Sequence, residues 1–167
     1  MPKLPPALRK KLIAVILSGA SLMGITATYT SYWEGKSNET YLDPVGIPTI
    51  CHGHTGPEVK LGQYKTDEEC LALLEKDLSW AFEVIKREVK VPLTQGQTVA
   101  LASYIFHVGA GNFRSSTLLK LINAGEMPKS CKQYSRWIYA KGVVLPGIVT
   151  RRAADEWLCT FDLPKAA

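Results

Sequence analysis

The feature that most constrains this chain is a stretch without charge between Lys11 and Glu34, which begins like a membrane anchor and ends directly in Trp33-Glu34-Gly35. Positions 12–29 would form an 18-residue helix, about 27 Å long against a hydrocarbon core of about 30 Å. Eight of these residues are strongly apolar and nine are Gly, Ala, Ser or Thr. The segment can therefore enter a bilayer, but little free energy holds it there.

Three interpretations of this segment are open. Positive residues lie only on its N-terminal side, so an uncleaved anchor would leave the N-terminus in the cytoplasm and the rest of the chain outside. A cleaved signal peptide would use Ile25-Thr26-Ala27 as a poor processing site. An ordinary core helix would leave the basic cluster and the absence of charge unexplained. We favour the uncleaved weak anchor.

The overall charge does not indicate a nucleic-acid partner. The formal net charge is +5, but Lys3, Arg9, Lys10 and Lys11 supply four of the positive charges. Beyond Lys11, 16 Lys and Arg face 15 Asp and Glu, and no basic stripe with interleaved aromatic residues is present. The basic charge belongs to the N-terminus, where it bears on membrane orientation.

The pattern of turns and helices predicts an α+β fold in one catalytic unit. The stretch after Gly35 is rich in turn residues and predicts small hairpins. Thr66 and Thr94 each precede a Glu or Gln by three residues, which predicts capped helices at 66–89 and from 94 onward. Shorter helices are expected at 116–123, 128–139 and 149–161. The predicted order is an N-terminal segment at 1–31, a β lobe at 35–65, a connecting helix at 66–90 and a helical lobe at 92–161.

Two carboxylates stand out in the polar part of the chain. Glu34 follows the apolar segment beside Trp33, whereas Asp43 lies in the turn "YLDPVG". Hydrolysis of a glycosidic bond needs one carboxyl group that donates a proton and a second, ionised group that stabilises positive charge or activates water. Taken alone, the pair is better explained as two solvated surface acids, because a chain of this length offers many such pairs.

The spacing of these residues changes that interpretation. Glu34, Asp43 and Thr49, followed by "GHT" at 53–55, closely resemble the catalytic signature of the phage T4-type lysozymes. The segments "FHVGAGNFRSSTLLKLINAG" and "GIVTRRAADEWLC" resemble that family's cleft-lining helix and its late arginine segment. The resemblance implies a lysozyme-like α+β catalytic domain at 32–167, with a small β-hairpin lobe and a larger helical lobe joined by a long helix.

The resemblance also implies an activity and roles for residues. The substrate would be peptidoglycan, cut between N-acetylmuramic acid and N-acetylglucosamine by an inverting reaction. Glu34 would be the general acid, and Asp43 and Thr49 would place the attacking water. Either arginine of the late segment could hold Glu34. No metal or cofactor is expected, nor a nucleic-acid partner, and the protein should be a monomer. The implied substrate-binding residues are Asn112, His54, Arg151 and Arg152.

Four cysteines at wide spacings suit one or two disulfides in an exported protein, although four reduced thiols are an alternative. A Cys51–Cys70 bond would tie the hairpin to the long helix. A Cys131–Cys159 bond would join two late helices and contribute about 3 kcal/mol. A rival interpretation, a zinc amidase, would use Cys51, His52, His54 and Cys70 as ligands, but the spacing matches no strong zinc motif. His54 is better explained as a structural histidine bonded within the hairpin.

The missing linker between anchor and Glu34 predicts how such an enzyme is controlled. Only four residues separate Tyr29 from Glu34, so an inserted anchor pins the general acid at the inner membrane, away from Asp43 and Thr49. The expectation is a signal-anchor-release endolysin, inactive at the membrane and active once released into the periplasm, where the segment folds as the first helix. A non-enzymatic membrane lysis protein is the remaining alternative.

Overall fold

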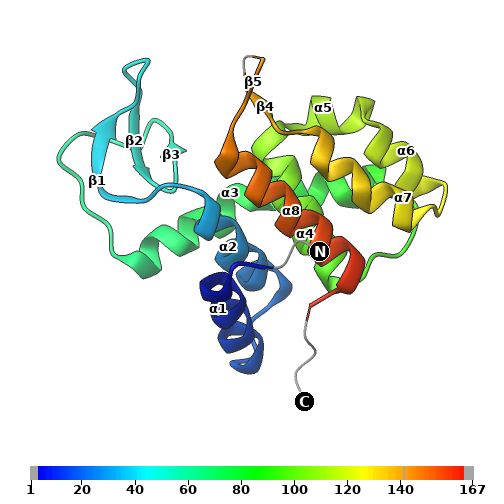
Figure 1. Cartoon of the computed structure of the whole chain (residues 1–167). Helices are drawn as coiled ribbons and strands as arrows, with labels where there is room; N and C mark the ends of the chain where they lie inside the picture. The colour runs from blue at the N-terminus through cyan, green and yellow to red at the C-terminus, as the bar shows by residue number, and fades with distance from the viewer. Residues whose placement is uncertain (1–3, 141, 164–167) are drawn as a thin grey trace.

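The computed structural model describes residues 4–140 and 142–163, so Lys3 of the basic cluster lies outside the described residues. The fold is α+β, as predicted: a small sheet stands on one side, most helices pack on the other, and the long helix α3 runs between them (Figure 1). The elements in chain order are α1 (Pro6–Leu17), α2 (Leu22–Trp33), β1 (Ser37–Leu42), β2 (Pro48–Cys51), β3 (His54–Thr55), α3 (Asp67–Glu88), α4 (Gln95–Val108), α5 (Ala110–Ser115), α6 (Thr117–Asn123), α7 (Met127–Cys131), η1 (Lys132–Arg136), β4 (Tyr139–Ala140), β5 (Val143–Val144) and α8 (Pro146–Phe161).

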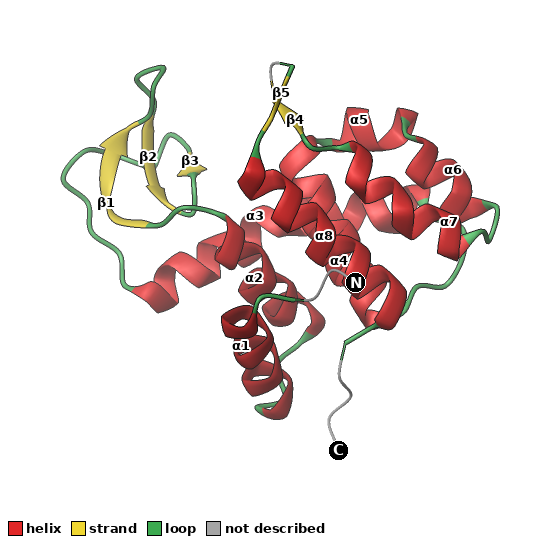
Figure 2. Ribbon diagram, viewed as in Figure 1, coloured by secondary structure: helices red, strands yellow, loops and turns green. Residues whose placement is uncertain are grey.

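The sheet is antiparallel, in the order β1-β2-β3, and forms most of the strand structure of the chain (Figure 2). On the central strand β2, Thr49 lies opposite both Tyr41 and Thr55. Ile50 and Cys51 are buried and pack with Cys70 at the start of α3. The sheet thus has its own small core, which fastens β2 to the long helix.

Both predicted capping boxes are present. Thr66 accepts a hydrogen bond from the Glu69 amide at 3.2 Å, and the Glu69 carboxylate accepts one from the Thr66 amide at 2.8 Å. Thr94 and Gln97 make the same reciprocal pair at the start of α4. These caps satisfy amides that have no partner in the first turn, so the helices begin where the sequence predicts.

The N-terminal segment corrects one expectation. Instead of a single helix over 12–29, the chain forms α1 and α2, separated by a turn. Gly19 adopts a left-handed conformation with φ of +75°, which glycine tolerates at least cost, and ends α1. Ser21 then caps α2 by accepting a hydrogen bond from the Gly24 amide at 3.1 Å.

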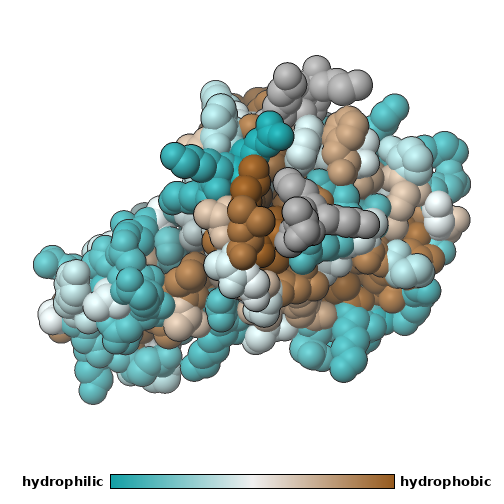
Figure 3. Space-filling model, turned by 90° about the horizontal axis from the view of Figure 1, so that it is seen from below, coloured by the Kyte–Doolittle hydropathy of each residue, from teal (hydrophilic) through white to brown (hydrophobic). Residues whose placement is uncertain are grey.

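The apolar side chains of this helical hairpin belong to the main core. Leu8, Leu12, Ile16 and Ile25 are all buried and share one cluster with residues of α4 and α8. Leu17, near the turn, is 66 % exposed, and the face seen from below carries an apolar patch surrounded by polar side chains (Figure 3). Among residues 4–140 and 142–163, no helix combines the length and apolarity that crossing a bilayer requires.

The later helices differ from prediction at their ends. Ser116 caps α6 at the expected place. The helix predicted at 128–139 is instead the short α7 followed by the 3₁₀ helix η1, and Tyr139 begins a small hairpin that the sequence did not predict. The last helix starts at Pro146 rather than at position 149, with proline in its first turn, where the missing amide costs nothing.

Candidate active site

Glu34 stands at the C-terminal end of α2, where the backbone turns extended. Its carboxylate oxygen Oε1 accepts a hydrogen bond from Arg151 Nη1 on α8 at 2.8 Å. The other terminal nitrogen of Arg151 reaches Ser103 on α4, 3.2 Å from its hydroxyl. Arg151 is buried, whereas the side chain of Glu34 is 24 % exposed. Arg151, which Ser103 on α4 holds in turn, therefore fixes Glu34, and part of the Glu34 side chain stays open to solvent.

Asp43 and Thr49 are linked through the backbone of Ile47. Asp43 Oδ1 accepts hydrogen bonds from the amides of Val45 and Ile47 at 2.9 and 2.8 Å. The Thr49 hydroxyl donates to the Ile47 carbonyl at 3.0 Å, and the Asp43 amide donates to the same carbonyl. The turn between β1 and β2 thus fixes both side chains relative to one another.

These bonds determine which lone pairs remain for a water molecule. Both amide bonds to Asp43 end on Oδ1, which leaves Oδ2 as an acceptor. The Thr49 hydroxyl donates its hydrogen to the Ile47 carbonyl, so its lone pairs are left to accept a hydrogen bond from a water. A water held by two acceptors directs its own lone pair outward, which is the arrangement that a nucleophile needs.

The two late arginines have different positions. Arg151 is the one that contacts Glu34; the sequence alone did not distinguish it from Arg152 in this role. Arg152 points elsewhere: it is fully buried, its Nη1 lies 2.8 Å from Asp155 Oδ2, and its Nη2 lies 3.1 Å from His107 Nδ1. Its side chain has no exposed surface, which argues against contact with a substrate, but the substrate-binding role of Arg152 stays a prediction.

His54 also differs from expectation. Its ring is 6 % exposed, with Nδ1 2.8 Å from the Asp77 carboxylate on α3 and Nε2 3.0 Å from Glu58. Both ring nitrogens are engaged by carboxylates, which favours the structural role that the sequence indicated; the substrate-binding role stays a prediction. The contact ties β3 to α3, rather than staying within the hairpin as expected.

Asn112 is exposed on α5, and its Nδ2 donates to the Val108 carbonyl at 2.7 Å. That bond fixes the direction of the side-chain amide. Its role in substrate binding stays a prediction.

The four cysteines form two disulfides, Cys51–Cys70 and Cys131–Cys159, in the predicted pairing. The first bond uses two of the four sulfur and nitrogen ligands that the zinc amidase interpretation requires. His54, a third, is engaged by two carboxylates. Three of the four residues of that interpretation are therefore engaged in other contacts.

A buried cluster behind the site was not foreseen from the sequence. It includes Asp155, Arg152 and Tyr29, whose hydroxyl donates to Asp155 Oδ1 at 2.7 Å. The one sequence signal was the Arg152-to-Asp155 spacing, which places opposite charges on the same face of a helix. Beside the cluster, partial burial of the His107 ring and then the charges of Arg151 and Arg152 lower the pKa of His107 to about 4.

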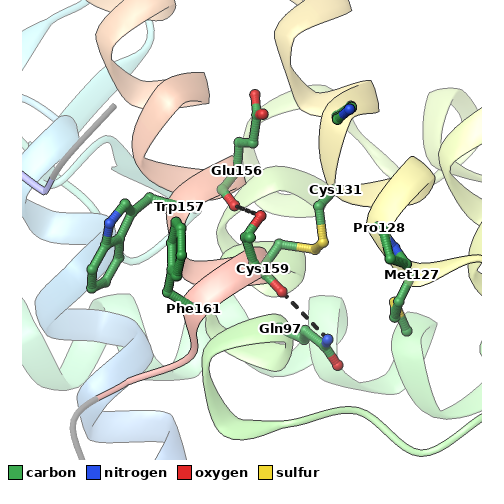
Figure 4. A pocket seen from close by; sticks show the side chains of 10 residues that line it. Gln97, Met127, Pro128, Cys131, Glu156, Trp157, Cys159 and Phe161 are labelled. Carbon is green, nitrogen blue, oxygen red and sulfur yellow. Dashed lines mark hydrogen bonds between the residues drawn. A yellow bond between two sulfur atoms is a disulfide. The ribbon is translucent and has the colours of Figure 1, made fainter. Parts of the chain in front are cut away.

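A cavity of about 330 Å³ lies beside the Cys131–Cys159 disulfide (Figure 4). Trp157 and Phe161 line it, and Gln97 closes one edge by donating to the Cys159 carbonyl. None of Glu34, Asp43 and Thr49 contributes to it. The chemistry therefore does not lie in this cavity.

The fold and the arginine-held glutamate place the protein in the class of lysozyme-like glycoside hydrolases. The sequence model of the family described as phage lysozyme matches residues 31–155, and the chain belongs to that family. A SAR-endolysin of Enterobacteria phage P21 is 41 % identical over 162 residues, 95 % of this chain and 98 % of that relative.

Solved structures agree with this assignment. The crystal structure of a P22 lysozyme mutant is 33 % identical, covers 80 % of this chain and 93 % of its own, and has a TM-score of 0.75. The muramidase domain of SpmX from Asticaccaulis excentricus is 29 % identical, covers 81 % of this chain and 94 % of its own, and has a TM-score of 0.74. The protein is an enzyme, a lysozyme.

Proposed function

We propose that the enzyme hydrolyses the β-1,4 bond between N-acetylmuramic acid and N-acetylglucosamine in peptidoglycan, with inversion at the anomeric carbon. The observation that carries this proposal is that the chain holds both a partly open Glu34 fixed by Arg151 and an Asp43–Thr49 unit fixed through Ile47. Glu34 would protonate the leaving oxygen, and the Asp43–Thr49 unit would activate a water; an inverting glycosidase needs both steps.

In this mechanism, protonated Glu34 donates its proton to the glycosidic oxygen as the bond to the anomeric carbon breaks. Arg151 engages Oε1 and keeps the carboxyl group in place, while Oε2 makes none of the hydrogen bonds formed among the described residues. Asp43 accepts a proton from the water that Thr49 orients, and the water oxygen bonds to the opposite face of that carbon. The charged transition state forms between the two carboxyl groups.

We also propose that the N-terminal segment is an uncleaved anchor at the host inner membrane, facing the periplasm, and that release activates the enzyme. The same apolar residues serve both states, because Leu12, Ile16 and Ile25 would contact lipid before release and are core residues in the folded enzyme. Leaving the bilayer therefore exposes few of them to water. α2 also carries Glu34, so an inserted anchor holds the general acid away from Arg151.

Product analysis tests the reaction. Purified soluble enzyme should release muropeptides that end in reducing N-acetylmuramic acid, and NMR of the fresh product should show the inverted anomer. Glu34→Gln should lose at least about 1,000-fold in kcat while it stays folded. Glu83→Gln, an exposed carboxylate on α3, is the matched control and should keep full activity. Products that lack cut glycan, or an active Glu34→Gln enzyme, would contradict the proposal.

Cell fractionation tests the release. Full-length protein should be found in the membrane fraction and should move to the periplasm, with its N-terminus intact, after the membrane potential is collapsed. Mass spectrometry of the released protein identifies its first residue. A soluble protein shortened near Ala27 before the potential is collapsed would rule out the anchor.

A further inference from the structure

A buried polar cluster lies in the core between α2 and α8. Its residue on α2, Tyr29, lies five positions before Glu34. The Tyr29 hydroxyl donates to Asp155 Oδ1 at 2.7 Å, and Arg152 Nη1 lies 2.8 Å from Asp155 Oδ2. The Arg152 guanidinium also lies 5.0 Å from the centre of the Tyr104 ring. Tyr29, Arg152 and Asp155 have no exposed surface. None of these groups has a part in the mechanism above.

The cluster forms the first of two polar contacts between the same pair of helices. Tyr29 on α2 meets Asp155 on α8, and Glu34 at the end of α2 meets Arg151 on α8. The contacts are five positions apart on α2 and four apart on α8. Because each residue turns a helix by about 100° and advances it by about 1.5 Å, a slip of one position would break both. Apolar side chains of α2, such as Ile25, also pack in this core, but they make no directional bond that would fix the rotation of the helix.

Burial explains why the contact is strongly directional. Burial, followed by the charge of Asp155, raises the pKa of Tyr29 well above its usual value, so its proton stays on the hydroxyl and is donated. Without that donor, Asp155 Oδ1 would be a buried acceptor with one partner fewer. An unsatisfied buried acceptor is costly, so α2 is held in the rotation that supplies the hydroxyl.

We propose that Tyr29 is a positioning residue: its bond to Asp155 sets the rotation of α2 and thereby places the Glu34 carboxyl group on Arg151. This inference rests on the proposed role of Glu34 as general acid. Tyr29 is the last residue of the proposed anchor, so it would have one role in the membrane and another, the positioning of Glu34, after release. In the inserted state Tyr29 lies at the bilayer surface and Asp155 lacks its donor, so the bond forms only when the released segment has packed in its active orientation.

The test compares two tyrosines on one helix in full-length soluble enzyme. Tyr29→Phe removes only the buried hydroxyl, and Tyr32→Phe removes an exposed one that makes none of the hydrogen bonds among the described residues. Kinetics on soluble glycan strands should show kcat lower by about 10-fold for Tyr29→Phe, with KM within about twofold, because a small displacement of a catalytic group slows the chemical step. Tyr32→Phe should match the unaltered enzyme.

Circular dichroism at the assay temperature establishes that each variant is folded. A Tyr29→Phe enzyme that melts earlier but keeps the kcat of Tyr32→Phe would show a structural role only and would overturn the inference. A double-mutant cycle adds a second readout: Asp155→Ala and Tyr29→Phe should lower kcat less than additively, because both break one contact. Additive losses would also overturn it. If Asp155→Ala does not fold, the comparison of Tyr29→Phe with Tyr32→Phe alone tests the inference.

Failure of this inference is distinguishable from failure of the proposed function. If Glu34→Gln is inactive and Tyr29→Phe is fully active, the reaction assignment stands and the positioning role falls. If Glu34→Gln is active, the reaction assignment itself is wrong.

Discussion

The His107 imidazole shows how one residue beside the site couples stability to pH. Its pKa is lowered to about 4 by partial burial and by the arginines behind it, against about 6.5 for an unfolded chain. Between these two values, the unfolded chain binds a proton that the folded enzyme does not bind. The free energy of unfolding should therefore be intact above about pH 6.5 and should fall as the pH is lowered toward about 4.

Urea unfolding at several pH values, with and without His107→Gln, measures this effect. Glutamine can still accept the hydrogen bond from Arg152 but does not titrate. The variant should lose less stability than the unaltered enzyme between pH 6.5 and 4. The slope of its free energy of unfolding against pH should be smaller by an amount that corresponds to the uptake of up to about one proton on unfolding. Identical slopes for both proteins would show that His107 titrates normally in the folded state.

For single residues, the spacing along the chain led to the prediction of Glu34, Asp43 and Thr49 as catalytic residues, because their separations resemble the lysozyme signature. Their catalytic roles stay a prediction. Arg151 was expected as one of two arginines that could hold Glu34, but its own partner Ser103 was not predicted, since Ser103 and Arg151 lie on helices distant in sequence and meet only through packing. His54 was misassigned for a similar reason: its partner Asp77 belongs to another element, and sequence proximity favoured the hairpin.

Among the elements, the turn between α1 and α2 is where the two proposed states of the chain differ most. A straight helix over 12–29 suits the bilayer, whereas the enzyme needs Gly19 in a left-handed conformation. Alanine at this position costs about 1 kcal/mol in the left-handed turn and favours a continuous helix by a similar amount. Gly19→Ala should therefore slow release from the membrane and destabilise the soluble enzyme.

Gly24→Ala is the matched control for this prediction. It adds the same methyl group to the same apolar segment, but inside α2, where the nearest atom is a Glu75 side-chain oxygen at 3.4 Å. It should favour helix in both states and leave release nearly unchanged. Fractionation over time after collapse of the membrane potential, together with thermal melts of the soluble forms, compares the two. Equal release by both variants would mean that the turn does not limit refolding.

Local sequence signals predicted the helices and strands well only where all the residues that form the signal lie close together in the chain. The capping boxes at Thr66 and Thr94 placed α3 and α4 correctly, because both partners of each box lie within four residues. The break at Gly19 was missed, since glycine is tolerated within a membrane helix and its left-handed turn depends on packing of α1 against α2. The β4–β5 hairpin was missed because strands of two residues carry almost no periodic pattern.

At the scale of the whole molecule, the two disulfides fasten different parts of the enzyme. Cys51–Cys70 joins the sheet to α3 across 19 positions, and Cys131–Cys159 joins α7 to α8 across 28. Loop closure predicts about 3 kcal/mol of stability from each, because the cross-link restricts the unfolded chain to a similar degree in both cases. The consequences for activity should differ, since Cys51 lies on β2 two residues after Thr49.

Replacing each pair by alanine separates these effects. Urea unfolding should show a loss of about 3 kcal/mol for either double variant. Turnover, measured where both variants are folded, should fall about 10-fold only without Cys51–Cys70, because β2 then loses its covalent attachment to α3 and Thr49 its fixed place. Without Cys131–Cys159, kcat should stay within twofold. Equal activity losses would show that the helical lobe positions the site as much as the sheet does, and that the covalent link from β2 to α3 has no special part in placing the water.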